Sequence, residues 1–121
     1  MIARNGYQIL FWLCISATIV LSLMPGGGKP LFLFQDKLAH GVVYALLFFL
    51  SVQAFSHRCP KWSLALVLLA FGLSMELAQS MTSYRQADGW DMLANTAGIL
   101  LVWLLLAGEK VVRGQSIVKE E

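Results

Sequence analysis

The chain has 121 residues, of which 58% are hydrophobic and only 13% are charged, and its mean hydropathy is +0.68. A soluble domain carries about 25% charged residues, so this composition excludes a small soluble globular protein and predicts a single integral membrane domain. The net charge of +2 comes from short basic flanks, so no nucleic-acid partner is expected.

Four apolar stretches predict four transmembrane helices. They cover residues 7–24, 38–55, 62–80 and 91–107, near the lower limit of about 17 residues for a helix that crosses the hydrocarbon core. Helices are expected because open strands cannot span lipid and the runs lack the alternation of a barrel. The predicted fold class is therefore an all-α four-helix membrane bundle. Residues 108–121 are expected to fray as a short tail.

The connections between these stretches contain helix-breaking residues. "MPGGGKP" follows the first helix, "SHRCPK" is a short turn in which Pro60 suits a helix start, and "MTSYRQADGW" is a polar loop. We interpret the first helix as retained rather than cleaved, since no small-x-small cleavage site precedes "PGGG". Cys14 and Cys59 would lie at different depths, so no disulfide framework is expected.

The lysine and arginine distribution predicts the orientation. One side of the membrane would carry six basic residues: Arg4, Arg58, Lys61, Lys110, Arg113 and Lys119. The other side would carry three: Lys29, Lys37 and Arg85. This bias places both termini in the cytoplasm, and Trp62 and Trp90 would mark the interfacial boundaries of the third and fourth helices.

Polar residues gather where the second helix begins. Asp36, Lys37, His40 and Tyr44 fall in "DKLAHGVVY", and Asp36, His40 and Tyr44 share one helix face at spacings of i, i+4 and i+8. Each has an ordinary alternative explanation. Asp36 would cap the helix, Lys37 would extend to the interface, and His40 and Tyr44 would hydrogen-bond to neighbouring helices.

A second polar group surrounds the loop between the third and fourth helices. Glu76 and Gln79 close the third helix, Arg85 and Asp88 occupy the loop, and Asp91, Asn95 and Gly98 share one face of the fourth helix. Asp91 could be a helix-start acid, Arg85 and Asp88 a solvated ion pair, and Gly98 a close-packing residue.

The topology places these residues on the same side of the membrane, predicted to be the extracytoplasmic side. At about 1.5 Å rise per residue, His40, Glu76 and Asn95 each lie about one turn inside the boundary. Because the alternative is lipid, the three polar strips are expected to face each other. Glu76 is the strongest functional candidate, since a carboxylate within a membrane segment is costly. A purely structural polar network is the alternative.

The ordered set of motifs resembles the VanZ-like membrane proteins. It comprises "SLMP", "DKLAHGVVY", "ELAQ" and the R..D..D...N..G pattern of Arg85, Asp88, Asp91, Asn95 and Gly98, across about residues 21–100. The resemblance implies a small four-helix protein of the bacterial inner membrane. The founding member of that family accompanies glycopeptide-resistance genes and is associated with lower susceptibility to teicoplanin. The resemblance implies no defined reaction.

Three functions follow as hypotheses. The first is a site that binds an amphiphilic or lipid-linked envelope molecule, whose anionic head group would meet Lys37, His40 and Arg85. Predicted ligand-binding residues are Asp36, Lys37, Tyr44, Gln79, Arg85 and Asn95. The second is a non-catalytic assembly or transport-accessory subunit. A homo-oligomer is compatible with the binding site and with the accessory subunit. A monomeric transporter is not expected, because the remaining membrane interior carries few polar residues.

The third hypothesis is an enzyme that modifies an amphiphilic or lipid-linked envelope molecule. Glu76 or His40 would act as general base or acid, with Asp88 or Asp91 orienting its partner and Arg85 or Lys37 stabilising negative charge. No cofactor is predicted. A metal held by Asp36, His40, Glu76 and Asp91 is only a variant of this hypothesis, because their spacing matches no defined metal motif.

Overall fold

The computed structural model describes residues 2–24, 35–82 and 89–120, and all their side chains except those of residues 35, 36 and 115–120. These residues form four α-helices: α1 (Arg4–Leu23), α2 (Gln35–Phe55), α3 (Lys61–Ser80) and α4 (Gly89–Glu120). All four are long and apolar enough to cross a membrane. The all-α class is confirmed, four helices lie where the four membrane spans were predicted, and Pro60 is the N-cap of α3.

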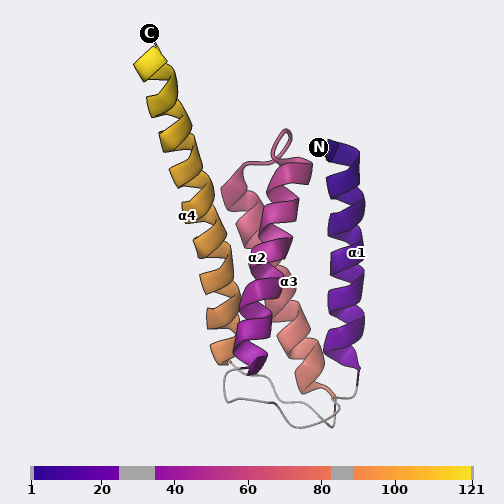
Figure 1. Ribbon diagram of the computed structural model, residues 1–121. Coiled ribbons are helices and arrows are strands. Elements are labelled where there is room, and N and C mark those ends of the chain that lie inside the picture. Colours follow the sequence, from indigo (N-terminus) through magenta and orange to yellow (C-terminus); the bar gives the residue numbers. More distant parts are fainter. Residues whose placement is uncertain (1, 25–34, 83–88, 121) are drawn as a thin grey trace.

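The helices alternate in direction through the bundle (Figure 1). The N-terminus, the α2–α3 connection and the C-terminal part of α4 lie at one end. α1 and α3 finish, and α2 and α4 begin, at the opposite end, which we call the distal end. α2 is the central helix, because it packs against α1, α3 and α4. This arrangement brings the beginnings of α2 and α4 and the end of α3 to the same level.

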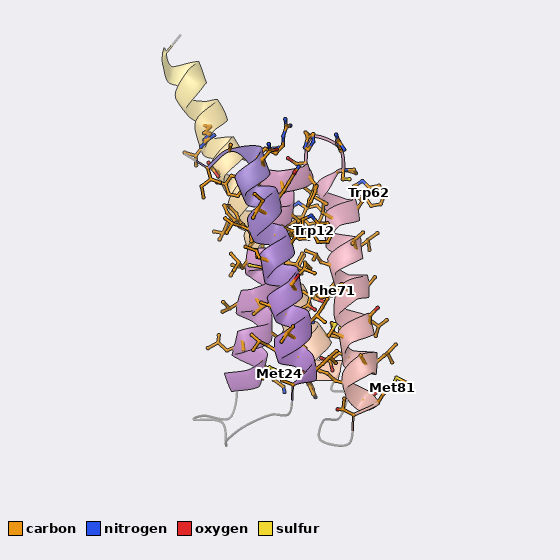
Figure 2. All side chains as sticks on the ribbon, turned by 90° about the vertical axis from the view of Figure 1, so that its right-hand side faces the viewer. Trp12, Met24, Trp62, Phe71 and Met81 are labelled. Atoms are coloured by element: carbon orange, nitrogen blue, oxygen red, sulfur yellow. The ribbon has the colours of Figure 1, made fainter. Side chains whose placement is uncertain are left out.

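Large apolar side chains cover the outside of the bundle. The fractional exposure of Val67 is 66% and that of Leu104 is 70%, and side chains project outward along the length of the helices (Figure 2). In water such a surface would favour aggregation, whereas lipid tails solvate it. The chain is therefore a multi-pass membrane protein by the length and surface of its helices.

The core lies mainly between α2 and its neighbours. Leu47 and Phe48 of α2 are fully buried, with Leu68 of α3 and Ile99 of α4 almost so. Phe48 also stacks on Trp103 of α4, with 5.7 Å between the ring centroids. Hydrophobic burial adds little when lipid is the solvent, so close packing of such side chains supplies much of the association between helices.

Gly98 lets α4 approach the backbone of α2 closely. A Cβ atom at Gly98 would collide with the backbone carbonyl of Gly41, and it would lie 3.1 Å from the backbone nitrogen of Ala45. Small residues at such crossings allow backbone contact between membrane helices. This crossing fixes the position of α4 relative to α2 directly beside the polar residues of both helices.

The structure differs from the sequence prediction at the C-terminus. α4 continues to Glu120, through most of the segment expected to fray as a tail beyond residue 107. This segment has no proline, and Glu109 forms an i,i+4 ion pair with Arg113, a spacing that supports an exposed helix. The polar residues beyond 107 therefore continue the helix as an exposed segment.

Basic residues gather at the end of the bundle that holds the termini. His57 lies in the α2–α3 connection, and partial desolvation together with the charges of Arg4 and Arg58 lowers its pKa below the usual value. Arg4 begins α1, and the start of α1 lies at the same end of the bundle as the α2–α3 connection (Figure 1). The positive charge used to predict orientation is therefore grouped in space.

Candidate functional site

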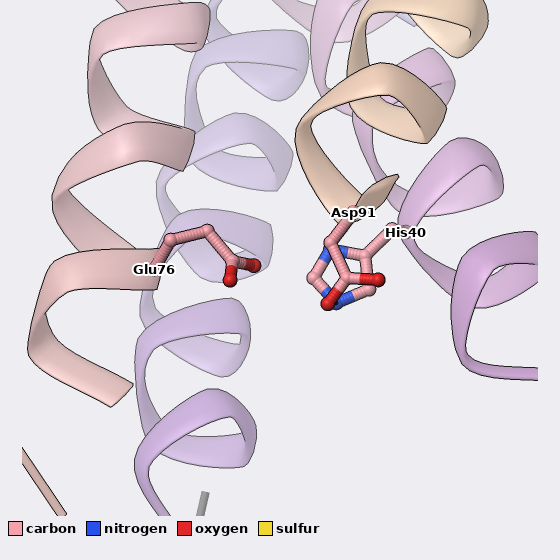
Figure 3. Close-up of side chains that lie close together, drawn as sticks. All are labelled: His40, Glu76 and Asp91. Atoms are coloured by element: carbon pink, nitrogen blue, oxygen red, sulfur yellow. The ribbon is translucent and has the colours of Figure 1, made fainter. Parts of the chain in front are cut away.

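Three helices bring ionisable side chains together at the distal end (Figure 3). His40 comes from the first turns of α2, Glu76 from the last turns of α3 and Asp91 from the first turn of α4. One ligand atom from each of the three lies within 4.8 Å of the other two. We call His40, Glu76 and Asp91, together with Lys37 and Asn95, the polar cluster. Two of its members in direct contact, His40 and Asn95, lie 55 residues apart in the sequence.

Asn95 fixes the orientation of His40. The Asn95 side chain is 1% exposed, and its Nδ2 donates to Met92 Sδ at 3.8 Å. Its Oδ1 therefore faces His40 Nδ1 at 3.1 Å, and an amide oxygen can only accept. This hydrogen bond therefore forms in the tautomer that carries a proton on His40 Nδ1, and in that tautomer the lone pair of neutral His40 is on Nε2.

The free side of the His40 ring faces Asp91. His40 Nε2 and Asp91 Oδ2 are 3.6 Å apart, too far for a hydrogen bond, and the two groups form an ion pair only when His40 is protonated. The other carboxylate oxygen, Asp91 Oδ1, is 3.6 Å from Lys37 Nζ. It is buried and accepts no hydrogen bond within the described part of the chain. Asp91 is thus held between a cation and an imidazole.

Glu76 is the most deeply placed carboxylate of the polar cluster. It is 4% exposed, and its side chain points from α3 toward His40 and Asp91 (Figure 3). Exposure of the side chains rises from 13% for Asp91 to 22% for His40 and 33% for Lys37. The polar cluster therefore extends from the bundle surface into its interior.

Tyr44 and Gln79 border the polar cluster. Tyr44 is 3% exposed, and its hydroxyl lies near Gly72, where a Cβ atom would be 3.2 Å away. Gln79 points elsewhere: its Nε2 donates to the backbone oxygen of Ser22 in α1 at 3.0 Å. Gln79 was predicted to bind a ligand, and in the structure its amide joins α3 to α1.

Three predicted residues receive no structural test. Arg85 and Asp88 lie outside the described residues, as does the side chain of Asp36. The sequence analysis did not select Gly72, which lies against Asn95 of the polar cluster, or Gly41, whose backbone carbonyl meets Gly98. A Cβ atom at Gly72 would lie 2.9 Å from Asn95 Nδ2. The sequence gives little indication of such a role, because a glycine within an apolar helix does not show which neighbouring helix packs against it.

The fold and the polar cluster together define a class: a multi-pass membrane protein with ionisable side chains grouped near one end of a four-helix bundle. Comparison with known proteins adds no further assignment. No family model, curated protein or solved structure matches the chain. The function must therefore be argued from the chemistry of the polar cluster.

Proposed function

We propose that this protein resides in the bacterial inner membrane, with both termini in the cytoplasm. In that orientation the polar cluster binds or modifies the head group of a lipid-linked or amphiphilic envelope molecule at the outer leaflet. The positive-inside bias supports the orientation, because the grouped basic residues would then face the cytoplasm. The resemblance to VanZ-like proteins supports the compartment.

One observation carries the proposed binding site. Exposure to solvent falls across the polar cluster, from Lys37, whose side chain is one-third exposed, to Glu76, which is almost fully buried. Such groups within a membrane segment are costly and mark binding or transfer sites by default. A head group at the interface could meet Lys37 and His40 by charge-assisted hydrogen bonds, while its acyl chains lie against the apolar outer surface. This arrangement suits an amphiphile better than a fully soluble ligand.

A modifying reaction would use the same side chains. Glu76 or His40 would serve as general base or acid, Asp91 would orient His40, and Lys37 would stabilise negative charge on the head group. His40 is the better base in geometry, because Asn95 holds its Nδ1–H and leaves the Nε2 lone pair free to accept a proton.

Lipid analysis tests the proposal. The full chain, expressed in bacteria and extracted in polymer nanodiscs, should carry an enriched anionic or lipid-linked envelope molecule, identified by mass spectrometry. Lys37→Gln and Glu76→Gln should lower that enrichment. Lys110→Gln is the matched control, because it removes an exposed lysine from the opposite end of the bundle. Equal lipid profiles in all four proteins would refute a head-group site.

A structural role is the second candidate, and two hydrogen bonds favour it. His40 to Asn95 joins α2 to α4, and Gln79 to Ser22 joins α3 to α1. If the polar cluster only holds helices together, its variants should unfold more easily while the bound lipids stay unchanged. A link to glycopeptide susceptibility is tested separately, by comparing teicoplanin inhibition of a susceptible strain with and without the expressed chain.

A further inference from the structure

Three side chains of the polar cluster place potential metal ligands close together. Two ligands of a tetrahedral zinc ion, each about 2.1 Å from the metal, lie about 3.4 Å apart. His40 Nε2 and Asp91 Oδ2 are 3.6 Å apart, and a Glu76 carboxylate oxygen completes a set within 4.8 Å. In the metal-bound form the Glu76 oxygen would lie nearer to the other two than this.

The groups behind these three atoms hold them in the orientation that a metal requires. A metal-binding histidine usually donates its other N–H to an oxygen, which fixes the tautomer. His40 makes this bond through Nδ1 to buried Asn95, which leaves the Nε2 lone pair directed at the centre of the cluster. Lys37 faces Asp91 Oδ1, so Asp91 Oδ2 remains on the side of His40.

Electrostatics favours a cation at the centre. With His40 neutral, the lone pair of Nε2 faces a carboxylate oxygen, and a second carboxylate, that of Glu76, approaches the same point. Carboxylates that converge on one point repel each other, and a cation between them relieves that repulsion. Lys37 approaches Asp91 from the side of Oδ1, at 3.6 Å, and leaves the point between Asp91 Oδ2, His40 and Glu76 to another cation. A protonated His40 would relieve the repulsion through one ion pair, whereas a divalent ion would interact with all three groups at once.

We propose that His40, Glu76 and Asp91 bind a borderline divalent transition-metal ion of the Zn²⁺ type at the distal end. The imidazole nitrogen favours such an ion over Mg²⁺ or Ca²⁺, which take oxygen ligands. Three protein ligands leave at least one coordination position for water or a ligand oxygen, as in catalytic rather than structural zinc sites. The proposal stands without the proposed function, although a bound ion would attract an anionic head group.

Metal binding to the purified full chain tests the proposal. After removal of any affinity tag and stripping with EDTA, the protein in detergent should bind about one Zn²⁺ per chain, measured by elemental analysis and titration. Mg²⁺ in large excess should not displace it. Each of His40→Gln, Glu76→Gln and Asp91→Asn should weaken Zn²⁺ binding by at least about tenfold, since loss of even an outer-shell partner costs that much.

Matched controls separate this site from surface binding. His57→Gln and Glu109→Gln remove an exposed histidine and an exposed carboxylate at the other end of the protein, and they should leave Zn²⁺ affinity unchanged. The proposal would be overturned if the control variants lost as much Zn²⁺ affinity as the cluster variants. It would also be overturned if a variant that combines His40→Gln, Glu76→Gln and Asp91→Asn bound Zn²⁺ as tightly as the wild type.

Two measurements on the wild-type protein test the site even if the variants do not fold. Co²⁺ added to the stripped protein should give intense visible absorption typical of low-coordinate cobalt, which Zn²⁺ abolishes by competition. Zn²⁺ should also raise the unfolding temperature, because it binds the folded state preferentially. The weak spectrum of aqueous cobalt, with no thermal shift, would refute the site. Neither measurement involves a lipid ligand, so failure here is distinguishable from failure of the head-group proposal.

Discussion

Replacement of Gly98 by alanine should separate α2 from α4. The added Cβ would collide with the Gly41 carbonyl, and Ala45 N would lie 3.1 Å away. These are backbone atoms of a helix and cannot rotate aside, so the helices must move apart. His40 precedes Gly41, and Asn95 lies one turn before Gly98, so the same movement should lengthen the 3.1 Å hydrogen bond between them.

The magnitude follows from two opposing effects. Overpacking at a tight contact costs about 1–3 kcal/mol, and the immobile backbone of Gly41 favours the upper end of that range. Alanine gains about 0.5–1 kcal/mol over glycine in a helix interior. We therefore expect Gly98→Ala to lower the free energy of unfolding by about 2 kcal/mol, roughly a thirtyfold change in the folded-to-unfolded ratio.

Unfolding by SDS in mixed micelles, followed by circular dichroism, measures this effect. Gly108→Ala is the matched control on the same helix, because a Cβ there meets nothing within 4 Å. Gly72→Ala should fall between them, since its nearest contacts are the side-chain ends of Asn95 and Tyr44. If Gly98→Ala is as stable as Gly108→Ala, the close crossing of α2 and α4 is refuted.

Three further predictions concern packing, a polar contact and the C-terminal helix. Phe48→Ala should lower the free energy of unfolding by about 3 kcal/mol, because the ring is fully buried, whereas lipid-facing Leu104→Ala should change it little. Gln79→Leu should cost about 0.6 kcal/mol in the same assay, the average for a hydrogen bond between membrane helices, since it removes the bond to Ser22. Glu109→Gln should lower the free energy of unfolding by no more than about 0.5 kcal/mol, because an exposed i,i+4 pair contributes only about 0.3–0.5 kcal/mol.

Each of these predictions has a contrary result. Equal losses for Phe48→Ala and Leu104→Ala would mean that α2 is not the central helix. A loss above about 2 kcal/mol for Gln79→Leu would exceed the largest measured membrane hydrogen bonds and would indicate a role for Gln79 within the polar cluster. A loss above about 1 kcal/mol for Glu109→Gln would exceed what an exposed ion pair contributes. Rapid backbone hydrogen exchange throughout residues 108–120 would contradict the helix observed there.

The polar cluster was only partly accessible to sequence reasoning. The helix spacings of His40 and Asp91 indicated which faces carry polar atoms, and alternating topology put them at one level with Glu76. The direction of Gln79 was not predictable, because a glutamine near a helix end can reach either of two neighbouring helices. Its choice of Ser22 depends on where α1 packs. The helical form of residues 108–120 was missed because a polar segment beyond a membrane span has no packing partner to signal a helix.

The sequence by itself determined the class of environment and the periodicity of the chain. Apolar runs of membrane length must be helices, since lipid leaves no other partner for their backbone groups. Tertiary structure decided which atoms meet. The Gly41–Gly98 crossing sets how close α2 and α4 approach, and with it the contact of His40 with Asn95 and Asp91. Such contacts depend on helix rotation and separation, which follow from packing against neighbours and are not encoded in any one segment.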